Sequence, residues 1–179
     1  MLASSRKMSE KVNKQFGILA QIDSMLKRER VDYWIRGGWA LDFILAKIRD
    51  NHADIDLVTW SRHRVLLVER LSASGFEVIP TARPERQVDF QRESIDVSFV
   101  FIERDKEGLL YSPGVPKWHW SEDSITYRVC HLGGFAARPL SPDFLLSEKL
   151  GYEAAMGRKL RHKDRESIEL LNRVLYCDG

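Results

Sequence analysis

Two stretches of the sequence decide the fold: residues 34–42, WIRGGWALD, and residues 52–57, HADIDL. In the first, a short β-like run meets the pair Gly37-Gly38, after which apolar residues return at helical spacing. In the second, apolar residues alternate with Asp54 and Asp56, the period-two pattern of a strand with one buried and one polar face. The predicted order is therefore strand, glycine turn, helix and acidic strand.

The acidic strand predicts metal chemistry. Asp54 and Asp56 are separated by one residue, which puts both carboxylates on one face of the strand. Asp96 begins a later strand with the same alternation, so a third carboxylate could converge on the first two. Apposed carboxylates resist joint ionisation unless a cation neutralises them. We therefore expect divalent metal at this site, with Mg²⁺ as the natural ion and two ions shared among Asp54, Asp56 and Asp96.

The glycine pair adds an anion-binding feature to the acidic strand. Backbone N–H groups at a tight glycine turn that opens a helix can hold the oxygens of a triphosphate. Each signal alone has a plain structural alternative, namely a solvated strand face for Asp54 and Asp56 and an ordinary turn for Gly37-Gly38. Their order along the chain favours a shared cleft for phosphates and metals.

The rest of the chain is predicted to alternate helices and strands. Apolar periodicity indicates further helices and hairpins. The predicted helices cover residues 9–30, 62–74, 143–156 and 162–176, and the predicted hairpins cover residues 88–91 with 95–102 and residues 125–132 with 135–140. Ser141-Pro142 is typical of a helix start, with serine as the cap and proline in the first turn.

These residues resemble a known group. The glycine and aspartate motifs look like the signature of the DNA polymerase β-like nucleotidyltransferase superfamily, and more narrowly they are similar to the small aminoglycoside and lincosamide nucleotidyltransferases. Gly151-Tyr152-Glu153 and Lys163-Asp164-Arg165 resemble the C-terminal helical signature of the same group. The resemblance covers the chain from about Trp34 to Leu171.

The resemblance implies roles for individual residues. Gly37 and Gly38 would hold triphosphate oxygens, and Asp54, Asp56 and Asp96 would be catalytic metal ligands, with Asp96 also able to accept the acceptor hydroxyl proton. Weaker correspondences imply substrate or phosphate contacts for Asp42, Arg49, Lys149 and Lys163. Two positions depart from the family pattern: Arg49 is displaced from the usual basic position before the acidic motif, and Ser167 stands in the region where another acid is common.

The fold class that we expect is α/β (α+β): a small mixed twisted β-sheet with flanking helices, plus a C-terminal helical segment. Residues 1–105 would form the catalytic core, and residues 106–179 would complete the substrate cleft. The implied activity is a metal-dependent transfer of a nucleoside monophosphate, as AMP from ATP, to a hydroxyl of an aminoglycoside or lincosamide, with release of pyrophosphate. Two alternatives are a toxin-antitoxin type enzyme that modifies a partner protein and a non-catalytic nucleotide-binding module.

The composition limits the kinds of partner that we expect the chain to bind. The 179 residues carry a formal net charge of only +2, so no global field favours nucleic acid or a membrane surface. Only Cys130 and Cys177 are present, and their wide separation argues against a disulfide framework. No apolar run resembles a signal peptide or a membrane span. We expect a cytoplasmic monomer or homodimer whose ligands are a nucleoside triphosphate and a small acceptor.

Several residues admit two interpretations. Trp39 fits a buried helix face better than a base-stacking role, whereas His52 fits equally well as a carboxylate-orienting residue and as the end of a loop. Trp118, His119 and Trp120 could line an acceptor pocket or belong to the core. Lys149 could contact phosphate or extend into solvent. The basic run at residues 158–165 fits an exposed helix start better than a nucleic-acid site.

Overall fold

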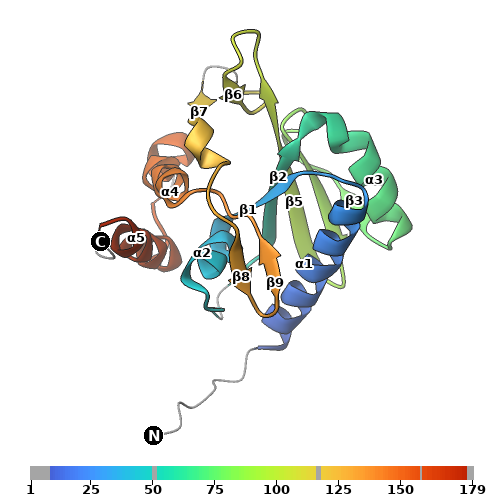
Figure 1. The fold of residues 1–179 in the computed structure, drawn as a ribbon, viewed down its shortest axis with the longest axis horizontal. Coiled ribbons are helices and arrows are strands. Elements are labelled where there is room, and N and C mark those ends of the chain that lie inside the picture. Colours follow the sequence, from blue (N-terminus) through green and yellow to red (C-terminus); the bar gives the residue numbers. More distant parts are fainter. Residues whose placement is uncertain (1–8, 50–51, 116–117, 158, 177–179) are drawn as a thin grey trace, which may run out of the picture.

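The computed structural model describes residues 9–49, 52–115, 118–157 and 159–176, and for residues 152–156 it describes the backbone alone. Figure 1 shows the elements in chain order. The helices are α1 (Glu10–Arg28), α2 (Gly37–Leu45), α3 (Arg64–Ala73), α4 (Pro142–Met156) and α5 (His162–Tyr176), with short 3₁₀ turns at Ser61–His63 and Glu122–Ser124. The strands are β1 (Tyr33–Arg36), β2 (Ile55–Trp60), β3 (Glu77–Ile79), β4 (Gln87–Arg92), β5 (Ile95–Arg104), β6 (Leu110–Tyr111), β7 (His119–Trp120), β8 (Cys130–Leu132) and β9 (Phe135–Ala137).

The central sheet is mixed, with the strand order β1-β2-β5-β4-β3. Strands β2 and β5 are parallel and lie in the middle, whereas β1 with β2 and β4 with β5 are antiparallel. Strand β6 extends one end of β5, and β7 pairs with β6. The predicted α/β (α+β) class with a mixed sheet is confirmed.

One face of the sheet is apolar because the strands alternate as the sequence predicts. Ile55 and Leu57 of β2 and Val97 and Phe99 of β5 are almost completely buried, and they join a core that includes Leu19 of α1. Figure 1 shows α1 and α3 on one side of the molecule and α4 and α5 on the other. The opposite face is polar at the start of β2 and β5, where it bears Asp56, Asp96 and Ser98, whereas Val58 and Val100 further along the same face are buried.

Local sequence signals explain where the elements begin and end. Ser9 caps α1, since its hydroxyl accepts a hydrogen bond from the backbone N–H of Val12 at 3.3 Å. Ser141 caps α4 in the same way through the N–H of Phe144. The link between β4 and β5 is the pair Glu93-Ser94, and both residues have positive φ, the conformation of a tight two-residue hairpin turn.

The second predicted hairpin lies at the predicted place in the chain, but its strands are shorter than predicted. Strands β8 and β9 pair around Gly133-Gly134, but residues 125–129 are not a strand. The chain after β9 instead pairs with the outer edge of β1, where Ile35 donates to the carbonyl of Arg138 and accepts from the N–H of Leu140, both at 2.8 Å. The helix after the glycine pair begins at Gly37 itself, and the short strands β3, β6 and β7 have no counterpart among the predicted strands.

The predicted division at residue 105 stays a prediction. The sheet continues beyond that point through β6 and β7. Cys177 and Arg158 lie outside the described residues. Within the described ranges, no helix has both the length and the apolar composition needed to cross a bilayer.

Leu57→Ala should test the central strand. Leu57 is fully buried on β2, so truncation leaves a cavity and should lower the free energy of unfolding by about 3 kcal/mol and Tm by about 10 °C. Val65→Ala is the matched control, because Val65 is 69% exposed. Thermal unfolding of both variants is the measurement, and an unchanged Tm for Leu57→Ala would contradict the assigned strand.

Candidate active site

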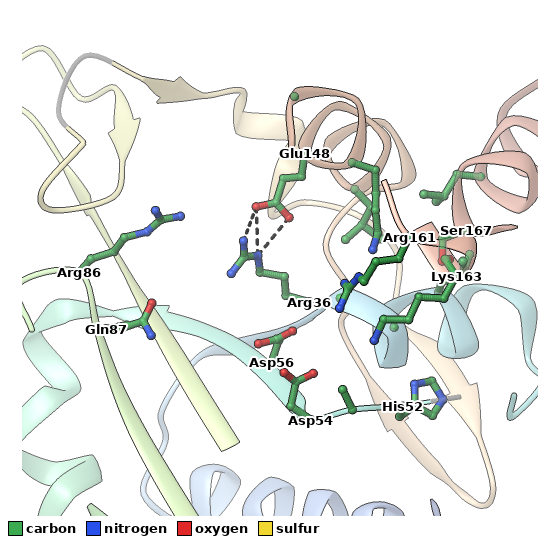
Figure 2. Close-up of a pocket in the computed structure, with 18 of the residues that line it drawn as sticks. Arg36, His52, Asp54, Asp56, Arg86, Gln87, Glu148, Arg161, Lys163 and Ser167 are labelled. Atoms are coloured by element: carbon green, nitrogen blue, oxygen red, sulfur yellow. Dashed lines mark hydrogen bonds and ion pairs between the residues drawn. The ribbon is translucent and has the colours of Figure 1, made fainter. Parts of the chain in front are cut away.

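A cavity of about 880 Å³ opens on the polar face of the sheet. It is bounded by the β1–α2 turn, the start of β2, the segment before β4, and the facing sides of α4 and α5. Figure 2 shows that Asp54 and Asp56 lie on its floor between two groups of basic side chains. The predicted residues Gly37, Gly38, Arg49, Asp54, Asp56, Lys149 and Lys163 all line this cavity.

The glycine turn is held tightly against the acidic strand. Gly37 has φ +67°, and a Cβ built there would lie 2.7 Å from Oδ2 of Asp56. Any larger residue would therefore be strained and would displace the carboxylate. Gly37 opens α2, and no side chain caps the first turn of this helix. The helix N-terminus thus presents backbone N–H groups and a partial positive charge beside Asp56.

Asp54 and Asp56 have no protein partner within the described part of the chain, where neither carboxylate accepts a hydrogen bond or forms an ion pair. Burial and the neighbouring carboxylate of Asp54 raise the pKa of Asp56 to about 6. The described residues contain no group of three or more side chains close enough to hold a metal ion by themselves. Two carboxylates are still a suitable donor set, because Mg²⁺ in nucleotide sites takes one or two carboxylates together with phosphate oxygens.

Asp96 lies on the same polar face but not in the cavity lining. Ser98, two residues further along β5, pairs with Asp56, so Asp96 lies towards the end of the face where Asp54 directly precedes β2. Its side chain is exposed and accepts a hydrogen bond from Gln91 at 2.7 Å. The structure therefore brings Asp54 and Asp56 together without assembling Asp96 with them, and its catalytic role stays a prediction.

Asp42 does not line the cavity, because its side chain is fully buried. Its two oxygens accept hydrogen bonds from the backbone N–H of Arg49 at 2.8 Å, from Nε of Arg49 at 2.6 Å and from Nε2 of His52 at 2.6 Å. Arg49 and His52 both line the cavity. Asp42 thus holds Arg49 and His52 by hydrogen bonds, and its own contact with a ligand stays a prediction. His52 lies in the loop before β2 and is also a buried partner of this carboxylate.

A second buried carboxylate organises the basic side chains of α4 and α5. Asp164 accepts hydrogen bonds from Nζ of Lys149 at 2.9 Å and from Nε of Arg161 at 2.8 Å. Although burial raises its pKa, these hydrogen bonds hold the pKa of the Asp164 carboxyl well below its usual range. Lys163 also lines the cavity, and burial and nearby Arg161 lower its pKa. Lys149, Arg161 and Lys163 thereby form one cationic wall.

Sequence reasoning missed a second group of charged residues. Arg36 donates to both oxygens of Glu148, with Nη2 to Oε1 at 2.6 Å, and this pair joins β1 to α4 across the cavity. Arg83, Arg86 and Gln87 line the cavity from the segment that leads into β4. Only Arg36 stands next to a recognised motif, and scattered arginines in a loop carry no pattern that a sequence can reveal.

The aromatic residues divide between the two interpretations. Trp118 is 44% exposed and lines the cavity, whereas Trp120 is buried against Phe144, with ring centroids 4.3 Å apart. Trp39 is buried, as expected, and stacks on His52 with centroids 4.2 Å apart. One tryptophan is therefore available to a ligand, and the other two belong to the packing.

Solved structures with this fold include two antibiotic-modifying enzymes. The lincosamide antibiotic adenylyltransferase LnuA, solved with lincomycin bound, matches 94% of this chain and 99% of its own with a TM-score of 0.70 at 18% identity. ANT(2'')-Ia, solved with adenylyl-2''-tobramycin, matches 95% of this chain and 92% of its own with a TM-score of 0.76 at 17% identity. At such low identity these matches establish the nucleotidyltransferase fold.

Sequence comparison narrows the relationship. A lincosamide resistance protein from Staphylococcus haemolyticus is 28% identical over 68 residues, which is 38% of this chain and 42% of that protein, so the aligned segment spans less than half of the relative's length. The sequence model of the aminoglycoside-2''-adenylyltransferase family matches residues 18–171. This match contains the glycine turn, the acidic strand and the cationic wall. The chain therefore belongs to the aminoglycoside-2''-adenylyltransferase family.

Proposed function

We propose that this protein transfers a nucleoside monophosphate, as AMP from ATP, to a hydroxyl group of a small antibiotic-like acceptor such as an aminoglycoside or a lincosamide. The observation that carries the proposal is the placement of Asp54 and Asp56, whose carboxylates have no hydrogen-bond or ion-pair partner among the described residues, against the uncapped N-terminus of α2 in one cavity. Backbone donors for phosphate and carboxylates for a divalent cation then share one site. The family and the antibiotic-modifying enzymes of the same fold support the choice of reaction.

The cavity suits small ligands. Its volume of about 880 Å³ lies within the range of small-molecule and cofactor sites. It also contains an exposed aromatic surface, Trp118, for packing against an apolar or sugar face. No feature of the described residues favours a partner protein as the substrate.

Different residues of the cavity would serve different steps of the transfer. The Gly37 turn, Arg49, Lys149, Arg161 and Lys163 would bind and orient the triphosphate. The acceptor oxygen then forms a bond to the α-phosphorus, the bond from that phosphorus to the bridging oxygen breaks, and pyrophosphate leaves with the electron pair. The acceptor hydroxyl proton passes to a base, for which Asp96 is the candidate.

Asp54 and Asp56 are the residues that would hold Mg²⁺. When bound, the ion neutralises phosphate charge and lowers the pKa of the acceptor hydroxyl. The raised pKa of Asp56 fits this role, because a carboxyl that resists ionisation beside Asp54 gains most from a nearby cation.

The proposed reaction is tested directly by measuring nucleotidyl transfer. The protein is incubated with Mg²⁺, each nucleoside triphosphate in turn, and a panel of antibiotics that includes lincomycin and tobramycin. Pyrophosphate release and a product heavier by one nucleoside monophosphate are the expected result. Absence of such a product with every pair would refute the proposed reaction.

Asp54→Asn and Asp56→Asn should each reduce transfer below detection while the protein stays folded, because each removes a ligand for the cation. Both variants should also lose the rise in Tm that Mg²⁺ and a non-hydrolysable triphosphate give the wild type. Asp123→Asn is the control, since Asp123 is an exposed acid outside the cavity. Near wild-type transfer by either site variant would disprove the metal assignment.

Gly37→Ala should weaken triphosphate binding by about tenfold or more, because the new Cβ would overlap Asp56 and close the helix N-terminus. Left-handed strain alone would also lower Tm. Gly75→Ala separates the two effects, since Gly75 has φ +85° with no atom within 4 Å of the added Cβ. Calorimetric titration with a non-hydrolysable triphosphate should show weakened binding in Gly37→Ala only, and equal affinities in both variants would make Gly37 an ordinary turn residue.

Asp96→Asn tests the third carboxylate. If Asp96 accepts the hydroxyl proton, its loss should slow single-turnover transfer by about 10² and leave triphosphate affinity almost unchanged. Rapid-quench kinetics and calorimetry on the same variant measure the two quantities. Full transfer activity would return Asp96 to the role of an exposed strand residue, and lost nucleotide binding would make it a ligand of the nucleotide-bound metal.

A further inference from the structure

The basic side chains of the cavity form two separate groups. Figure 2 shows Arg161 and Lys163 on one side of Asp54 and Asp56, and Arg86 on the other side, with the Arg36–Glu148 pair between them. The first group is continuous with the cationic wall and the N-terminus of α2. The second group, Arg86 with Arg83, comes from the segment before β4 at the opposite edge of the cavity, and Arg36 lies between the two groups. A single triphosphate on the first group leaves the second group for another ligand.

Arg86 has an unused donor. Its Nε is buried without a hydrogen-bond partner among the described residues. Burial, and then the nearby charges of Arg36 and Arg83, lower the pKa of its guanidinium. A buried charged donor without a partner is costly, so a ligand that supplies an oxygen here would relieve that cost.

The acids near Arg86 do not cancel this positive charge. Both oxygens of Glu148 accept hydrogen bonds from Arg36. Arg83 and Glu85 stand on the same segment as Arg86, and both are exposed to solvent, which screens their opposite charges alike. Among the described residues on this side of the cavity, Arg36 and Glu148 neutralise each other, and the half-buried guanidinium of Arg86 is the positive charge that solvent screens least.

From this arrangement we infer that the acceptor is a hydroxylated molecule with at most one positive charge, which presents a hydrogen-bond-accepting oxygen to Arg86, and that polycationic acceptors are rejected. The inference rests on the proposed nucleotidyl transfer, because it takes the second group as the acceptor side. Juxtaposed like charges in a partly desolvated site repel each other and suppress binding of the wrong partner. Arg83 and Arg86 are then specificity-determining residues, and Trp118 is an exposed aromatic side chain in the lining of the same cavity.

Lincomycin and tobramycin serve as probes of the two classes of acceptor because they differ in positive charge. Lincomycin carries one basic amine together with an amide oxygen, whereas tobramycin is a polyamine. Binding is measured by calorimetry on the wild type with Mg²⁺ and a non-hydrolysable triphosphate present, so that Asp54 and Asp56 are neutralised. Lincomycin should bind at least about tenfold more tightly than tobramycin.

Charge reversal tests the residues themselves. Arg86→Glu and Arg83→Glu should each weaken lincomycin binding and strengthen tobramycin binding by about tenfold. Lys106→Glu is the matched control, because it makes the same charge change at a side chain that is 88% exposed and lies outside the cavity. Arg83 is exposed, so its variant should fold even if Arg86→Glu does not. Raising the salt concentration should narrow the wild-type preference, since screening weakens repulsion between charges.

The outcomes separate this inference from the proposed reaction. Tobramycin binding as tight as lincomycin binding, or no measurable lincomycin binding, overturns the inference. An unchanged preference in Arg83→Glu overturns it as well. Absence of pyrophosphate release with every acceptor refutes the reaction while the binding measurements still report on charge selectivity. A preference for lincomycin that reverses in Arg83→Glu and persists in Lys106→Glu supports the inference.

Discussion

The arrangement of the site depends on the contact between the first residue of α2 and the carboxylate of Asp56. The chain leaves β1, turns at Gly37 with positive φ and starts a helix within van der Waals reach of β2. A helix N-terminus and an acidic strand can approach this closely only where no side chain intervenes. Once the contact exists, phosphate donors and metal ligands fall within one cavity. The central parallel pair of β2 and β5 then sets which residues share its floor.

Much of this arrangement could be predicted from the sequence. Period-two alternation gave Asp54 and Asp56 a common face, and the same alternation on β5 put Asp96 on that face. The helices could be predicted because their apolar periodicity and caps are strong local signals. The glycine pair indicated the turn, although the positive φ belongs to Gly37 and not to Gly38.

Other features depend on contacts between distant residues, which no local pattern encodes. Asp42 and Asp164 are acids on helices, and only the fold reveals that each is buried beneath basic residues that it orients. The Arg36–Glu148 pair joins residues 112 positions apart. Residues 125–129 alternate like a strand, yet β1 pairs at that edge with residues 138–140. Tertiary pairing overrode propensity there.

The order in which the cavity wall appears along the chain bears on how this protein matures. Its lining begins at Arg36 and ends at Leu171, and the cationic wall depends on Asp164 in α5. When only the central sheet has left the ribosome, Asp54 and Asp56 are therefore present but the facing helices α4 and α5 are not. The nascent chain cannot enclose a ligand until α5 has emerged and packed on α4.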